Sequence, residues 1–275
     1  MSHHHHDPKN LAGKMLFSVL LNILITVVQI IGGIISGSLA LISDALHNLT
    51  DAVALVISYI AIWLQGKAKT EERTFGYQRA EILAALFNAS LLIIISFFLL
   101  KEAIFRLLSP AKVDSLIMMS VAGVGLLANA LTVVLLHGDK KRNLNVRAAY
   151  LHMLSDAVTS LGGILGGLCI LVFRFFWIDS LLTIGIVIYT LKEGYGIVSD
   201  AVGILMHNTP QGISVKKIEH ELLKIKEIKN IHHVHVWQMT EDNIHFEAHV
   251  ELKRDLATSE TCQLKEAIED ILHEK

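Results

Sequence analysis

The chain has 275 residues, of which 52% are hydrophobic and 18% charged, and its formal net charge is −2. This apolar share exceeds that of ordinary soluble domains, and the excess lies in roughly the first 200 residues, so we expect a polytopic membrane protein. The near-neutral charge, without a basic stripe, argues against a nucleic-acid partner. The two cysteines, Cys169 and Cys262, are isolated and predict no disulfide.

The N-terminal segment, residues 1–14, is expected to lie in the cytoplasm. It contains consecutive histidines, His3 to His6, which fit either a metal-collecting tract or an engineered remnant. No cleavable signal is expected, because the first apolar stretch is of full spanning length and no small-residue cleavage site follows it. The first span itself would therefore direct insertion into the membrane.

Apolar stretches long enough to cross a membrane follow this segment. A bilayer core of roughly 30 Å needs about 20 apolar helical residues. No proline interrupts any stretch, so backbone hydrogen bonds can close within each helix, as lipid requires. Together they form the predicted transmembrane domain, residues 15–200. We expect six spans, at residues 15–35, 39–64, 80–105, 115–136, 148–173 and 177–198.

The distribution of Lys and Arg between the loops predicts the orientation. One side of the membrane holds more of these residues than the other, and positively charged loops stay in the cytoplasm. Both termini are therefore expected inside the cell. The richer side holds Lys9, Lys14, Lys67, Lys69, Arg73, Arg79, Lys140, Lys141, Arg142 and Arg147, and the poorer side holds Lys101, Arg106, Lys112 and Arg174.

Two of the predicted spans carry a histidine followed, four positions later, by an aspartate. These pairs are His47 with Asp51 in the second span and His152 with Asp156 in the fifth. Residues four apart share one helix face, so two such helices can present two imidazoles and two carboxylates to a common point. An ionised Asp near the bilayer centre costs about 2.5 to 3.5 kcal/mol even on lenient scales. Because we expect no Lys or Arg in the central part of a span, a divalent cation would supply the missing charge.

The ligand types narrow the choice of metal. Imidazole nitrogen with carboxylate oxygen in a tetrahedral set favours Zn²⁺ over cobalt, cadmium or iron(II), whereas magnesium and calcium would prefer oxygen ligands alone. An alternative without metal stays open, in which each Asp is neutral or pairs with the His of its own helix. Asp44, one turn before His47, is expected either to support the ligands or to form a stage on the metal's path.

The last part of the chain has a different character. The cluster Asn208-Thr209-Pro210-Gln211-Gly212 predicts a linker, residues 201–213. The tail, residues 214–275, is expected to be a small cytoplasmic α+β domain, near the lower size limit for an independent core. Its periodicity predicts helices at residues 214–226 and 259–273 and strands at residues 231–240 and 244–252. His233, His235 and Trp237 are expected to share one face of the first strand, with His249 on the polar face of the second.

Taken together, these residues resemble the cation diffusion facilitator (CDF) family of zinc and divalent-metal transporters. The resemblance covers about residues 16–273, and its most specific part is the pair of His-x-x-x-Asp motifs in the second and fifth spans. The segments that carry it are Ser43-Asp44-Ala45-Leu46-His47-Asn48-Leu49-Thr50-Asp51, Phe75-Gly76-Tyr77-Gln78-Arg79-Ala80-Glu81, His152-Met153-Leu154-Ser155-Asp156 and His233-Val234-His235-Val236-Trp237.

The resemblance implies a fold, an activity and a location. The fold is an all-α transmembrane bundle of six helices with a cytoplasmic ferredoxin-like domain, usually in a homodimer. The activity is export of Zn²⁺ from the cytoplasm in exchange for protons, with cadmium or cobalt as further substrates. The expected location is the bacterial cytoplasmic (inner) membrane. In the tail, the family's regulatory metal site matches His235 and His249.

Two departures from the family pattern concern the histidines. The tail of the family adds a further strand after its second helix, often with another ligand, whereas this sequence ends at Lys275. Either the chain is truncated or the tail domain is incomplete, and in both cases we expect any tail metal site to have lost a ligand. The long His-rich loop between the fourth and fifth spans of many relatives is also missing, and only His137 lies near that position.

Energetics favour a coupled transporter over passive release. Moving a doubly charged ion outward against about 100 mV costs about 4.6 kcal/mol, and each entering proton releases about 2.3 kcal/mol plus about 1.4 kcal/mol per pH unit. Metal binds only the neutral imidazole, so the same residues can exchange Zn²⁺ for protons by alternating access. We expect no enzymatic activity. Two other functions stay open: a membrane-embedded metalloenzyme, although four protein ligands leave no open coordination position, and a non-transporting metal sensor.

Overall fold

The structure is a computed structural model that describes residues 8–137, 144–240 and 243–273. Six of its helices are long and apolar enough to cross a membrane, which confirms the predicted spans. A small domain with two antiparallel strands follows them, so the predicted fold class is also confirmed. The histidine run, the basic residues of the loop after the fourth span and part of the predicted turn at 241–243 lie outside the described residues. The membrane helices are α1 Pro8–Ser36, α2 Leu39–Gln65, α3 Ala80–Leu108, α4 Ser115–Leu136, α5 Leu144–Phe173 and α6 Trp177–Leu205.

Two of these helices extend well past the predicted spans. α1 begins at Pro8, where a proline is tolerated because an N–H in the first turn has no partner within the helix. α6 continues to Leu205 instead of stopping near residue 198. It closes where His207 adopts a φ of 58° and the N–H of Asn208 donates to the carbonyl of Gly203 at 2.9 Å.

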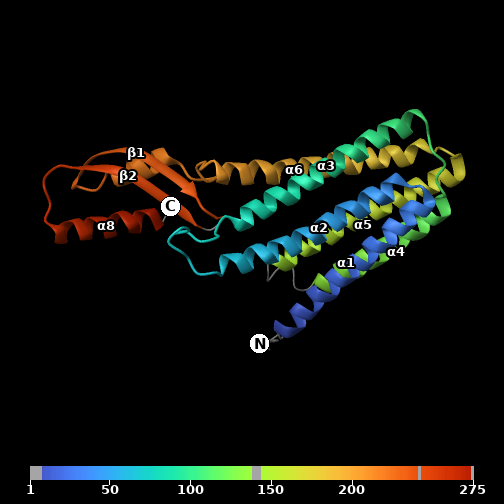
Figure 1. Cartoon of the computed structure of the whole chain (residues 1–275), viewed down its shortest axis with the longest axis horizontal. Coiled ribbons are helices and arrows are strands. Elements are labelled where there is room, and N and C mark those ends of the chain that lie inside the picture. Colours follow the sequence, from blue (N-terminus) through green and yellow to red (C-terminus); the bar gives the residue numbers. More distant parts are fainter. Residues whose placement is uncertain (1–7, 138–143, 241–242, 274–275) are drawn as a thin grey trace. The chain divides into compact units, whose positions relative to one another are not determined.

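The chain divides into two compact units, and most of the helical bundle lies in the first. That unit contains the chain up to Tyr59 together with Phe87–Ile197. Within it, α1 packs against α4 and α4 against α5, and Figure 1 shows α2 running beside α5. The approach of α1 to α4 depends on glycine, since a Cβ built on Gly32 would lie 2.4 Å from Val121 Cγ2.

The turn between α1 and α2 is anchored by a side chain from α6. Gly37 makes this turn with a φ of +72°, a conformation that favours glycine. Asp179, on α6, accepts a hydrogen bond from Ser38 Oγ at 2.6 Å. Its carboxylate also accepts from the backbone N–H of Leu39 at 2.8 Å and of Ala40 at 3.3 Å. These N–H groups lack partners within α2, so Asp179 caps the helix that carries His47 and Asp51.

The second unit contains residues Ile60–Leu86 and the chain from Val198 onward, including the tail domain. The tail has an apolar core in which α7 and α8 cover one face of the strand pair β1–β2. Ile218 and Leu222 of α7 meet Ile228 and Ile231 of β1 and Leu264 of α8 there. The tail elements are α7 Val215–Leu222, β1 Ile228–Gln238, β2 Ile244–Leu252 and α8 Thr258–His273.

The start of α8 is stabilised by Glu260. This side chain accepts a hydrogen bond from the N–H of Ala257 at 3.0 Å, as the acidic residue of a capping box does. It also accepts from Arg254 Nη2 at 2.8 Å. The charged hydrogen bond from Arg254, and then that from Ala257, hold the pKa of Glu260 below its ordinary value. Glu260 therefore stays ionised at neutral pH and caps α8.

A β-bulge changes which tail histidines share a face. The register of β1 shifts between His232 and His235, and His233 within this shift has a φ of 53°. His235 and Trp237 pair with Glu247 and His245 of β2, while His232 pairs with His249. The bulge therefore adds His232 to the face of His235 and Trp237, and the rings of His232 and His233 lie 5.4 and 5.1 Å from that of His249.

Candidate metal centre

The two His-x-x-x-Asp motifs face one another across α2 and α5. His47 Nε2 lies 3.7 Å from Asp51 Oδ2 on α2, and His152 Nε2 lies 3.6 Å from Asp156 Oδ2 on α5. The helices are joined by a third contact of 3.5 Å, between His152 Nε2 and Asp51 Oδ2. The two imidazole rings are 6.1 Å apart. We call these residues, His47, Asp51, His152 and Asp156, the four-residue site.

Three residues of the four-residue site place ligand atoms close enough to share one cation, and Asp51 Oδ2 lies beside both imidazoles. One potential ligand atom from each of His47, His152 and Asp156 lies within 4.8 Å of the others. The Oδ2 atoms of Asp51 and Asp156 are buried and have no hydrogen-bond partner among the described residues. Buried carboxylate oxygens without a partner are costly, and a bound cation would remove that cost.

One residue of α6 departs from the expected charge distribution. Because α6 continues to Leu205, Lys192 lies near the middle of a membrane helix, and the expectation that the central parts of the spans hold no Lys or Arg is wrong. Its side chain is exposed. Within the ranges that the structure describes, the ion pairs of Asp51 and Asp156 are with imidazoles and not with Lys192. The missing positive charge is therefore not supplied by α6.

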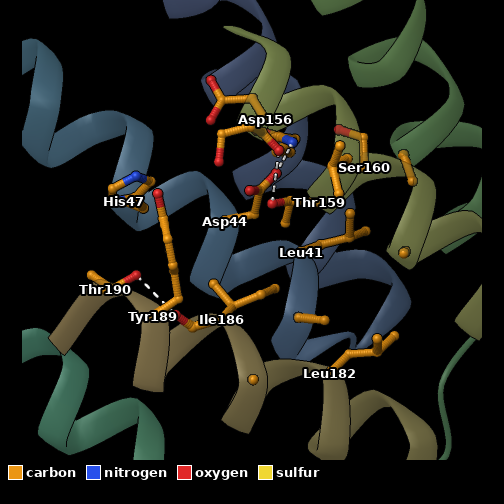
Figure 2. A pocket seen from close by; sticks show the side chains of 18 of the residues that line it. Leu41, Asp44, His47, Asp156, Thr159, Ser160, Leu182, Ile186, Tyr189 and Thr190 are labelled. Carbon is orange, nitrogen blue, oxygen red and sulfur yellow. Dashed lines mark hydrogen bonds between the residues drawn. The ribbon is translucent and has the colours of Figure 1, made fainter. Parts of the chain in front are cut away.

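A cavity of about 440 Å³ adjoins the four-residue site. His47 and Asp156 line it, together with Tyr189 and Thr190 of α6. Figure 2 shows these side chains around Asp44, which also lines the cavity. A space of this size holds on the order of ten water molecules, at about 30 Å³ each. A hydrated cation can therefore occupy it.

Asp44 is tied to α1 and not to the histidine that follows it. It is only 5% exposed and accepts a hydrogen bond from Gln29 Nε2 at 2.5 Å. Gln29 in turn accepts from Asn48 Nδ2 at 3.3 Å, so three buried polar side chains form a chain between α1 and α2. Gln29 therefore links α1 to α2 through hydrogen bonds to both Asp44 and Asn48.

The tail histidines gather differently from the pair that the family resemblance implied. His232, His233 and His249 each offer a ring nitrogen within 4.8 Å of the others. His235 is exposed, lies opposite Glu247 and lines a separate hollow of about 330 Å³. The structure therefore brings His249 together with His232 and His233 and not with His235. The sequence does show His232 next to His233. Neighbours in a regular strand point to opposite faces, so only the bulge reveals that both can reach His249.

Most of the chain matches a known family of transport proteins. Residues 15–206 match the family described as "Cation efflux transmembrane domain", and residues 210–275 match "Cation efflux protein, cytoplasmic domain". The chain is 37% identical over 277 aligned positions to the "Cadmium, cobalt and zinc/H(+)-K(+) antiporter" of Bacillus subtilis (strain 168), covering 100% of this chain and 89% of that protein.

Two further relatives are similar over most of their length. The "Zinc transporter ZitB" of Escherichia coli (strain K12) is 37% identical over 246 positions, covering 87% of this chain and 79% of that protein. The "Metal cation efflux system protein CzcD" of Cupriavidus metallidurans is 32% identical over 273 positions, covering 99% and 86%. These matches span both the helical bundle and the tail, so the chain belongs to the cation diffusion facilitator family of cation efflux transporters.

Proposed function

We propose that this protein exports Zn²⁺ from the cytoplasm in exchange for protons and that the four-residue site binds the transported ion. The observation that carries the proposal is the position of Asp51, whose Oδ2 lies within 3.7 Å of one imidazole and 3.5 Å of the other. Two nitrogens and two carboxylate oxygens form a set that zinc accepts and that magnesium and calcium do not prefer. Three relatives carry zinc or metal cation transport in their names.

The exchange with protons follows from the ligands themselves. An imidazole must be neutral to bind metal, so zinc and protons compete for His47 and His152. In the inward-open state, zinc binds and protons leave; in the outward-open state, protonation releases zinc. Both carboxylates remain within reach of an imidazole on their own helix. Each helix therefore keeps a His–Asp pair that can either coordinate the metal or bind a proton.

The same proposal includes an orientation and an assembly. The excess of Lys and Arg on one side favours cytoplasmic termini in a bacterial inner membrane. The match of residues 210–275 to a cytoplasmic domain supports the same orientation. We propose a homodimer on the family resemblance.

Zinc flux into proteoliposomes tests the exchange. With an interior one pH unit more acidic than the bath, proton exit supplies about 1.4 kcal/mol per proton, enough for about tenfold zinc accumulation per proton. We expect zinc to accumulate, with cadmium and cobalt transported and manganese excluded, and the interior pH to rise. Equal flux with and without the pH gradient would contradict proton exchange. Zinc binding without any flux would favour a non-transporting sensor, and zinc-dependent hydrolysis of peptide or ester substrates would favour a metalloenzyme.

We propose a second role for zinc in the tail, where it stabilises the transport-competent dimer. The supporting observation is the cluster of His232, His233 and His249, whose side chains are accessible at the tail surface. Three imidazoles provide a partial coordination shell for zinc or cobalt. The family resemblance instead pairs His235 with His249, so the two ligand sets share one residue.

Alanine variants separate the two ligand sets. We expect His249→Ala to remove one zinc equivalent from the purified protein and to lower the zinc activation of transport. His232→Ala with His233→Ala is expected to have the same effect, and His235→Ala to have little, because His235 lies opposite Glu247. Isothermal titration with zinc measures the stoichiometry. If His235→Ala loses the bound zinc and the His232→Ala, His233→Ala variant keeps it, the ligand pair His235 and His249 is favoured. If every variant keeps the bound zinc, the tail has no zinc site.

A further inference from the structure

The cavity beside the four-residue site extends in one direction only. Besides His47 and Asp156, its lining includes Ala40 and Leu41 at the start of α2, Met118 at the start of α4 and Leu182 at the start of α6. These residues lie toward the α1–α2 and α5–α6 turns. With cytoplasmic termini, the cavity therefore leads from the four-residue site to the outer side of the membrane.

Most of this route is apolar, and a buried hydrophobic cluster, the outer closure, lines its far end. Ala40, Leu41, Met118 and Ala122 belong to a buried hydrophobic cluster that Leu182 packs against. A divalent cation leaving its ligands would meet a surface that offers few oxygen atoms, and desolvated charge is costly in such surroundings. The route therefore needs a carboxylate beyond the four-residue site.

Asp44 occupies that position. Among the residues that line the cavity, the acidic ones are Asp44 and Asp156. Asp44 precedes His47 by one helical turn on the side of the outer closure, and Figure 2 shows it between His47 and Asp156 on one side and Leu41 and Leu182 on the other. A cation moving outward would thus pass from Asp156 to Asp44 before it reaches the outer closure.

Two neighbours support Asp44 as part of a built site. Gln29, which is fully buried, donates to Asp44 Oδ2 at 2.5 Å and fixes the carboxylate in the cavity wall. Ser160 lines the same cavity and is 3% exposed, and its Oγ has no hydrogen-bond partner within the described part of the chain. A Cβ built on Gly125 would lie 3.2 Å from Ser160 Oγ and 3.4 Å from Gln29 Nε2, so glycine there lets α1 and α5 place both groups beside α4.

We propose that Asp44, positioned by Gln29, is a second binding station for the transported divalent cation, between the four-residue site and the outer closure. Its carboxylate and the free Ser160 hydroxyl provide oxygen ligands that hold the cation, with part of its water shell, after it leaves His47 and Asp156. Oxygen ligands bind zinc more weakly than imidazoles do, which suits a station that the ion must leave. The inference rests on the proposed transport function and adds a step to it.

Zinc uptake by variants of Asp44 tests this station. Loss of the station should lower the maximal transport rate but leave the equilibrium affinity for zinc nearly unchanged. We expect Asp44→Asn to lower the maximal rate by about 10- to 100-fold, the range found when groups that support a metal site are removed. Zinc affinity at equilibrium is expected to change by less than about threefold, because the four-residue site remains. Asp44→Glu should restore most of the rate. Ser96→Ala, at a site equally buried but outside the cavity lining, is the control.

The outcomes distinguish this step from the transport function. A rate of Asp44→Asn close to that of the unchanged protein overturns the station, and so does a parallel loss of rate and equilibrium affinity, which would make Asp44 a structural or primary ligand. If Asp156→Ala transports zinc normally, the proposed function itself fails. If Asp156→Ala is inactive while Asp44→Asn is normal, only the station fails.

A cysteine at position 44 gives a measurement that does not depend on turnover. In a chain with Cys169→Ser and Cys262→Ser, Asp44→Cys introduces a thiol that binds cadmium strongly. We expect cadmium to slow modification of this thiol by a methanethiosulfonate reagent, and to do so also when Asp51→Asn weakens the four-residue site. Absence of protection, or protection that disappears with Asp51→Asn, would show that the cation does not bind at position 44.

Discussion

Replacing Asp51 with asparagine is expected to lower zinc transport by at least about 100-fold, because the loss of a ligand should cost at least as much as the roughly 10- to 100-fold effect of losing a group that only supports a ligand. Asp51 is the carboxylate whose contacts reach both imidazoles, at 3.7 Å to His47 and 3.5 Å to His152. Asparagine keeps the size and one oxygen but removes the charge that balances the cation. Uptake of zinc into proteoliposomes measures the loss.

A matched control for this variant is Asp114→Asn. Asp114 caps α4 by accepting from the N–H groups of Leu116 and Ile117, at 3.0 and 3.1 Å, and asparagine caps helices about as well. The control should therefore transport at the rate of the unchanged protein. If Asp51→Asn and Asp114→Asn transport equally well, the four-residue site is not the transport site.

The second large effect concerns stability. We expect Asp179→Ala to lower the free energy of unfolding by about 2–5 kcal/mol, because it leaves buried donors without an acceptor. Asp179 is 1% exposed and accepts from Ser38 Oγ and from the N–H groups of Leu39 and Ala40. The thermal midpoint of tryptophan fluorescence in detergent should fall clearly, and less so for Asp179→Asn, which retains one acceptor.

An exposed aspartate of the same helix provides the comparison. Asp200 accepts a single hydrogen bond from Gln211 Nε2 at 3.2 Å, and its side chain is exposed. Asp200→Ala should leave the thermal midpoint nearly unchanged, since exposed polar contacts contribute little. Equal midpoints for Asp179→Ala and Asp200→Ala would mean that the α1–α2 turn is held by packing alone.

Local patterns in the sequence were sufficient to predict the membrane helices and the helix faces that carry the two His-x-x-x-Asp motifs. The lengths of the apolar stretches predicted the spans, and the spacing of His47 and Asp51 predicted a shared face, because helical periodicity is a local property. That His47 and Asp51 meet the motif on α5 was inferred from chemistry, because unpaired carboxylates in lipid are costly. The contact of 3.5 Å between His152 and Asp51 is the structural counterpart of that argument.

Features that depend on distant or irregular contacts could not be predicted in this way. No periodic pattern relates Asp179 to Ser38, because the contact arises only when α6 returns to the start of α2. The bulge near His233 shifts the alternation of β1 and brings His232 beside His233 and His249, whereas the family resemblance had paired His235 with His249. The expectation that the central parts of the spans hold no Lys or Arg failed at Lys192, because the sixth span was ended near residue 198 and α6 continues to Leu205.

The contacts of the four-residue site differ in whether they lie within one helix or between two helices. Among the ion pairs that the described residues form there, two join residues of the same helix, and that between His152 and Asp51 crosses from α5 to α2. If the two helices slide by one turn, about 5.4 Å, each carries its own His and Asp along as an intact pair. The four-residue site then separates into two His–Asp pairs, each with half of the ligands. The ion is held more weakly, and no helix has to unwind.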